Sequence, residues 1–174
     1  MISILKIKEV LIKKQFRKTL IEKENNRVVC HKEIKSVGIL TTEEISKNLN
    51  VKDKVEEILG LKNAKIYSYK PQIKKEEVSF VNFSEIDFKW NGQVAQPNFK
   101  SFIDEPFDLL IGFFNKENLY LENAVLQSNA KFKVGLSKVN QQLFDIEFDV
   151  SVSNIEKFLQ ELKKYLLILK KLKN

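Results

Sequence analysis

The hydrophobic positions of the chain recur with two periods, one typical of β-strands and one typical of α-helices. Short apolar or alternating runs predict strands at 34–40, 64–69, 107–114, 131–137 and 144–150. Apolar residues spaced three and four apart predict helices at 2–24, 42–59 and 116–129, and a last helix that begins at Ser153 or Asn154. Strands that alternate with helices indicate an α/β protein. We therefore predict a single-domain, Rossmann-like fold with a mostly parallel open sheet, helices on both faces, and long N- and C-terminal helices.

Residues with special backbone preferences mark where these elements begin and end. Thr41 with Glu44 has the spacing of a capping box, and Gly60 suits the end of the helix that follows. We expect a break in that helix near Asn50, and Pro97 at the first position of a short helix. The chain then divides into a basic N-terminal helix with its connection, 1–33, and a Rossmann-like α/β domain, 34–174.

The most apolar run, 107–114, predicts a central strand that is buried on both faces. Ligands of open α/β sheets bind beyond the carboxyl ends of the strands. Polar side chains follow three of the predicted strands there, and we predict a ligand cleft from Thr41, Thr42, Asn115, Lys116, Asn118 and Ser137. Three single glycines lie in or at the end of strands, and without a GxGxxG or P-loop pattern they favour close packing over a phosphate cradle: Gly38, Gly112 and Gly135.

The net charge of +7 is concentrated at the two ends of the chain. Residues 1–20 hold six basic side chains and one acidic side chain, and residues 161–174 hold five lysines and one glutamate. We predict contacts to a polyanion from Lys6, Lys13, Lys14, Arg17 and Lys18, with Lys164 and Lys171 as a second row. We hypothesise that the terminal helices lie near each other, which would merge the two rows. Arg17 and Arg27 are the only arginines, so we expect no readout of DNA sequence.

The chemistry-bearing residues are few. The chain has one His and one Cys, adjacent at His31 and Cys30, and it lacks a GxSxG elbow, so we expect neither a metal site nor a triad. We expect no cofactor and no enzymatic activity. One cysteine cannot form an internal disulfide, no apolar run approaches the length of a membrane span, and Lys6 and Lys8 interrupt any signal peptide. We therefore expect a cytoplasmic protein.

Two clusters leave alternatives open. Asp145, Glu147 and Asp149 alternate on the last strand, where they could bind a cation, act as acid and base, form a solvated face, or pair with Lys131 and Lys133 on the neighbouring strand. The irregular segment 71–106 is rich in aromatic residues that could stack on single-stranded bases or form a core beneath a loop. These residues are Phe80, Phe83, Phe88, Trp90, Phe99 and Phe102.

Two resemblances add to this interpretation. The runs IKSVGIL, WNG, FDLLIGFF and AKFKVGLS, with the Leu/Lys-rich final helix, resemble a family of small basic bacterial proteins with a basic leading helix and no established activity. The stretch FDLLIGFF…NAVLQSNAKFKVGL is also similar to the N-terminal Rossmann-like half of heptosyltransferase-type glycosyltransferases. Those enzymes bind the sugar nucleotide mainly with a second domain, so this similarity implies no catalytic residue in the present chain.

The sequence therefore favours a non-enzymatic module that binds a polyanion, RNA or the ribosome, through lysine-rich terminal helices. A peripheral membrane protein or a protein-complex subunit that docks through the N-terminal helix is the alternative. A small nucleotide or nucleotide-sugar binder, or a transferase-like domain, is a further one.

Overall fold

The computed structural model describes residues 3–28, 30–71, 79–139 and 141–173. The helices are α1 (Ile4–Asn25), α2 (Glu43–Leu49), α3 (Val51–Leu59), α4 (Pro97–Asp104), α5 (Leu119–Gln127) and α6 (Ile155–Ile168). The strands are β1 (Val37–Thr42), β2 (Lys65–Tyr69), β3 (Asn82–Phe83), β4 (Leu109–Phe113), β5 (Lys133–Leu136) and β6 (Ile146–Phe148). Two 3₁₀ turns, η1 (Glu85–Asp87) and η2 (Gln141–Leu143), complete the described elements.

The strands form one six-stranded sheet in the order β3-β2-β1-β4-β5-β6, and every pair is parallel. This confirms the predicted α/β class, and the order is that of a Rossmann-type sheet. The strand from the run 107–114 is β4, which lies between β1 and β5 and is buried along its whole length. The chain turns to opposite sides after β1 and β4, so the topological switch point lies between these two strands.

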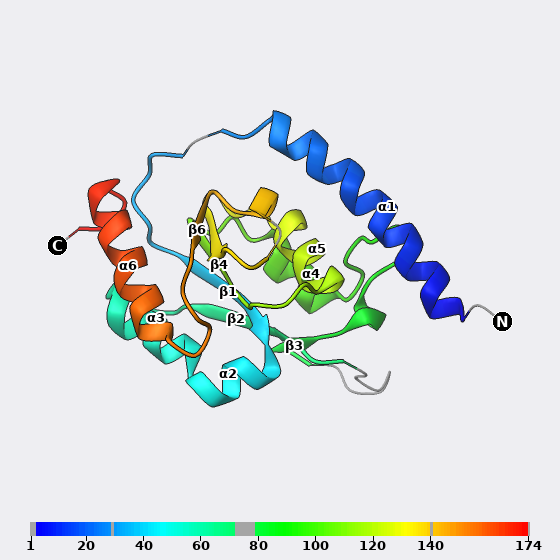
Figure 1. Cartoon of the computed structure of the whole chain (residues 1–174), viewed down its shortest axis with the longest axis horizontal. Coiled ribbons are helices and arrows are strands. Elements are labelled where there is room, and N and C mark those ends of the chain that lie inside the picture. Colours follow the sequence, from blue (N-terminus) through cyan, green and yellow to red (C-terminus); the bar gives the residue numbers. More distant parts are fainter. Residues whose placement is uncertain (1–2, 29, 72–78, 140, 174) are drawn as a thin grey trace.

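Helices cover both faces of the sheet (Figure 1). One core lies between the sheet and α1, α4 and α5, and the other lies between the sheet and α3 and α6. Ile12, Phe16 and Leu20 anchor α1 in the first core, whereas Phe158 and Leu162 anchor α6 in the second. The hypothesis that the terminal helices lie together is therefore wrong, because each buries its apolar stripe on a different face of the sheet.

The helix boundaries follow from residues that tolerate unusual backbone angles or cap a helix. Asn50 adopts φ 49° and separates α2 from α3, and Gly60 ends α3 with φ 68°, as predicted. Pro97 opens α4, also as predicted. The cap of α2 is Thr42 rather than Thr41, because β1 extends to Thr42, whose hydroxyl then accepts from the Ile45 amide at 3.2 Å.

The glycines of β4 and β5 make room for an aromatic ring. Gly112 and Gly135 are paired across the two strands, and Phe144 packs over both. A β-carbon on Gly135 would lie 2.3 Å from the ring of Phe144, and one on Gly112 would lie 2.8 Å from it. These positions therefore serve close packing, as the sequence predicted.

Most aromatic side chains of the irregular segment form a core. Phe83, Phe88, Phe99 and Phe102 are buried, and the rings of Phe83 and Phe99 stack with centroids 4.1 Å apart. The core interpretation is confirmed for these four residues. Phe80 and Trp90 are exposed, at 70% and 49%.

Candidate functional site

The predicted ligand cleft is partly assembled at the carboxyl edge of the sheet. Thr42, Asn115, Lys116 and Asn118 line one hollow of about 620 Å³ beside the switch point. Thr41 and Ser137 do not line it. The Thr41 side chain is buried and donates to the Phe113 carbonyl at 2.6 Å, and the Ser137 hydroxyl bonds Asp149 at 3.4 Å.

The polar side chains of this cleft already have structural tasks. Thr42 caps α2, and Asn118 caps α5 by accepting from the amides of Tyr120 and Leu121 at 3.1 and 3.0 Å. Capping residues are held in place by these bonds, so they offer a ligand few free donors or acceptors. They supply neither a nucleophile nor a base.

The charge of the cleft does not favour phosphate. Among the residues that the structure describes, its lining includes three glutamates and one lysine: Glu43, Glu44, Glu117 and Lys116. A hydrogen bond from Lys47 lowers the pKa of Glu43, which keeps that carboxylate ionised at neutral pH. Lys47 and Lys70 pair with Glu43 at 2.9 and 3.4 Å, so the charges in and around the described lining are close to balanced and give the phosphates of a nucleotide or nucleotide sugar no net attraction.

A second hollow, of about 900 Å³, lies between α1 and the same edge of the sheet. Lys13 and Arg17 of α1 line one side, and Tyr69, Tyr120 and Glu122 line the other. The two tyrosine rings stack with centroids 6.1 Å apart. Burial raises the pKa of Tyr120 to about 12 and raises the pKa of Glu122, so the phenol stays protonated at neutral pH.

The basic row of α1, which we define as Lys6, Lys13, Lys14, Arg17 and Lys18, is fully placed on the surface. Some other cations of the protein have partners: Lys8 donates to the Glu85 carbonyl at 2.9 Å, and Lys65 pairs with Glu105 at 2.7 Å. Within the described residues, no member of the basic row makes an ion pair. The row is therefore a set of five unpaired charges along 13 residues of one helix.

The predicted second row does not form. Lys164 is exposed on α6, on the other side of the sheet from the basic row. Lys171 is buried, with 3% of its surface exposed, so its prediction as a surface contact is wrong. Its ammonium donates to the Cys30 carbonyl and lies 4.8 Å from the centre of the Phe132 ring. The reason is that the chain turns back after α6 and directs this lysine inward.

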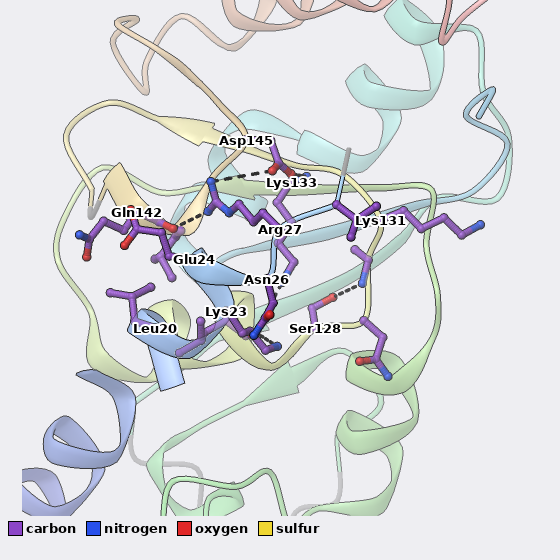
Figure 2. Close-up of a pocket in the computed structure, with 15 residues that line it drawn as sticks. Leu20, Lys23, Glu24, Asn26, Arg27, Ser128, Lys131, Lys133, Gln142 and Asp145 are labelled. Carbon is purple, nitrogen blue, oxygen red and sulfur yellow. Dashed lines mark hydrogen bonds and ion pairs between the residues drawn. The ribbon is translucent and has the colours of Figure 1, made fainter. Parts of the chain in front are cut away.

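A basic cavity of about 240 Å³ lies at the end of α1, and the sequence pattern does not predict it (Figure 2). Lys23 comes from the last turn of α1, Arg27 from the segment after it, and Lys133 from the start of β5. These residues are 110 positions apart at the extremes, and a lysine at the start of a strand carries no local signal of its own. Only the fold brings them together.

The described residues were also compared with the requirements of a metal site and of a membrane-spanning helix. Across residues 3–28, 30–71, 79–139 and 141–173, no group of three or more His, Cys, Asp or Glu side chains is placed to hold a metal ion. None of the helices in that part of the chain combines the length and apolar character needed to cross a bilayer. Two of the acidic residues on the last strand have different hydrogen-bond partners. Asp145 accepts from the Lys133 amide at 2.7 Å, and Asp149 bonds the Ser137 hydroxyl.

Comparison with known proteins identifies a family for this chain. The model of a family of unknown function (DUF6913) matches residues 8–169. No curated protein and no solved structure matches the chain. The similarity to heptosyltransferase-type enzymes therefore stays a prediction from a short strand–helix–strand pattern.

Proposed function

Because the chain belongs to the family of unknown function DUF6913, we propose its function from geometry: α1 binds RNA through the basic row. The observation that carries this proposal is a set of five exposed side chains that make no ion pair with any residue the structure describes: Lys6, Lys13, Lys14, Arg17 and Lys18. Unpaired cations along a helix match the regular charge of a phosphate backbone. The proposal is narrower than the sequence suggested, because α6 lies on the other face of the sheet and takes no part.

The described lining of the strand-end cleft has no excess of positive charge, which supports a binding role for α1 over a nucleotide-binding role for the cleft. The five side chains of the basic row are exposed, so an extended polymer can reach them. A predominance of lysine over arginine favours contacts to phosphates over readout of bases.

Binding to a fluorescent oligouridine tests the proposal. We expect the double variant Lys13→Gln/Arg17→Gln to bind about tenfold or more weakly near 100 mM salt, because two phosphate contacts are lost. The matched control Lys52→Gln/Lys62→Gln removes two exposed lysines that lie outside α1 and should bind like the native protein. Fluorescence anisotropy measures both. Equal weakening of the two variants would show that net charge, and not the basic row, drives binding.

A second candidate function rests on an apolar stripe of the same helix that shares only Lys14 and Lys18 with the basic row. Ile4, Ile7 and Leu11 form an apolar stripe at helical spacing and are 69%, 45% and 44% exposed. Lys14 and Lys18 continue the stripe toward the end of the helix. A helix with exposed apolar and basic residues is suited to dock on an anionic membrane surface.

Vesicle flotation separates this candidate from RNA binding. Vesicles that contain phosphatidylserine should float the native protein if α1 docks on membranes, and Ile7→Ser/Leu11→Ser should abolish flotation without weakening binding to oligouridine. The reason is that polar side chains remove the apolar area that enters the lipid but leave the basic row intact. If the native protein stays at the bottom of the gradient at low salt, the membrane candidate is rejected.

A further inference from the structure

The cavity at the end of α1 has an imbalance of charge. Its cationic lining residues are Lys23, Arg27, Lys131 and Lys133, and its acidic ones are Glu24 and Asp145. Lys131 is satisfied elsewhere, because it pairs with Asp108 at 2.6 Å. The other three cations line the cavity (Figure 2). Lys23 lies in the last turn of α1, Arg27 lies just after this helix, and Lys133 lies at the start of β5.

Within the described residues, Lys23 and Lys133 make no ion pair, and Arg27 has only a long one, with Asp145. The ammonium of Lys133 donates to the Val125 carbonyl at 2.6 Å, and the ammonium of Lys23 donates to the Leu126 carbonyl. Both acceptors lie in the last turn of α5, whose dipole accommodates part of the positive charge. Arg27 bonds the carbonyls of Phe144 and Gln142. Its guanidinium is 3.9 Å from Asp145, whose other oxygen accepts from the Lys133 main-chain amide at 2.7 Å.

This arrangement changes the pKa of Lys133. Burial, together with the charges of the neighbouring Lys23 and Arg27, lowers the pKa of Lys133 to about 7, and Asp145 acts in the opposite direction. Loss of solvent also lowers the pKa of Lys23. A cation that is partly removed from water either gives up its proton or gains an anion as a partner. An ammonium has three donors and a guanidinium has five, so all three side chains keep donors for such a partner.

We propose that this cavity is a binding site for a small dianion, a phosphoryl group or its equivalent, held by Lys23, Arg27 and Lys133. The cavity volume of about 240 Å³ is several times the roughly 30 Å³ that one water occupies, so it has room for a phosphoryl group and a small substituent. The proposal does not depend on RNA binding, because the basic row lies further toward the start of α1 and shares no residue with the cavity.

The first test uses sulfate, a dianion that does not titrate near pH 7, at constant ionic strength maintained with chloride. We expect a saturable rise in Tm for the native protein and about tenfold or more weaker binding for Lys133→Met and for Arg27→Gln. Lys62→Met, an exposed lysine outside the cavity, is the matched control and should bind like the native protein. The proposal is overturned if sulfate gives no saturable effect, or if all three variants respond alike.

The second test follows the proton. A bound dianion favours the charged form of Lys133, so sulfate binding should take up a proton near pH 7 and should strengthen as pH falls through 7. Calorimetry in two buffers of different ionisation enthalpy measures this uptake. Loss of the uptake in Lys133→Met assigns it to this lysine rather than to Glu24, Asp145, Lys23 or Lys131, which also line the cavity. Uptake that persists in Lys133→Met contradicts the assignment.

The third test identifies the source of the group by comparing inorganic phosphate, glycerol phosphate and a 5′-phosphorylated oligouridine. Equal affinity for the first two means that the phosphoryl group alone is recognised, and tighter binding of glycerol phosphate means that the substituent fills the cavity. Oligouridine that competes with sulfate only when it is phosphorylated would extend the site to an RNA end. Failure of all three to displace sulfate would overturn the proposal.

Discussion

Gly135→Ala is expected to lower the free energy of unfolding by about 2–3 kcal/mol. The added β-carbon would lie 2.3 Å from the Phe144 ring. The ring cannot shift toward the neighbouring strand, because it also packs against Gly112 there. Phe144 is buried, at 3% exposure, so its movement would open the core between β4, β5 and α5. Urea denaturation measures the loss.

A smaller side chain at position 144 should rescue this variant. Phe144→Leu alone leaves a void and costs stability, but Gly135→Ala/Phe144→Leu should recover about 1 kcal/mol or more relative to the sum of the single changes. The double-mutant cycle separates a steric conflict from a general intolerance of β5 to substitution. Additive effects, or a Gly135→Ala protein as stable as the native one, would show that the close packing of Phe144 does not require glycine at position 135.

Phe99→Ala is expected to cost about 4 kcal/mol of stability. Phe99 is completely buried and lies at the centre of an aromatic cluster: it stacks on Phe83 at 4.1 Å, and its ring centre lies 5.1 Å from that of Tyr67. Removing this ring leaves a cavity that the surrounding rings cannot close, because α4 and the sheet hold them apart. The midpoint of urea unfolding should therefore fall sharply.

Phe80→Ala is the matched control for this prediction. The Phe80 side chain is 70% exposed, so the same chemical change should alter stability by less than about 0.5 kcal/mol. A large loss in both variants would mean that the segment before β3 packs more tightly than the structure indicates. A small loss in both would contradict the central role of Phe99 in the core.

Much of the fold could be predicted from the sequence, because local residue preferences determine where several helices and strands begin and end. Asn50, Gly60 and Pro97 ended or began helices where their backbone preferences required it. The uninterrupted apolar run of β4 identified a strand with helices on both sides. The relative placement of α1 and α6 was not accessible, because each has an apolar stripe that fits either face of a sheet, and only the order of connections decides between the faces.

The candidate sites were less predictable for a similar reason. The residues after β1 and β4 could be placed at one edge, since parallel strands end together, but their charge and capping bonds emerged only in three dimensions. Lys171 looked like a surface residue because its helical spacing continued the stripe of α6. The helix ends at Ile168, and the turn that follows, with Lys170 at φ 56°, brings Lys171 inside. Spacing cannot reveal such a turn.

The central claim is that the basic row of α1 is an RNA-binding surface. Five phosphate contacts to a single strand predict a slope of about −3.5 in log affinity against log salt concentration, at about −0.7 per contact. Affinity for an oligouridine should then fall roughly a hundredfold between about 50 and 200 mM salt. A surface that merely keeps the protein in solution would show no such dependence.

The slope itself is the most direct measurement. A variant with glutamine at Lys6, Lys13, Lys14, Arg17 and Lys18 is compared with a control that has glutamine at five exposed lysines outside α1, namely Lys32, Lys52, Lys62, Lys89 and Lys138. Both variants lose the same net charge. We predict a slope near zero for the α1 variant and a slope near −3.5 for the control and the native protein. Equal slopes for the two variants would contradict the claim that α1 binds RNA.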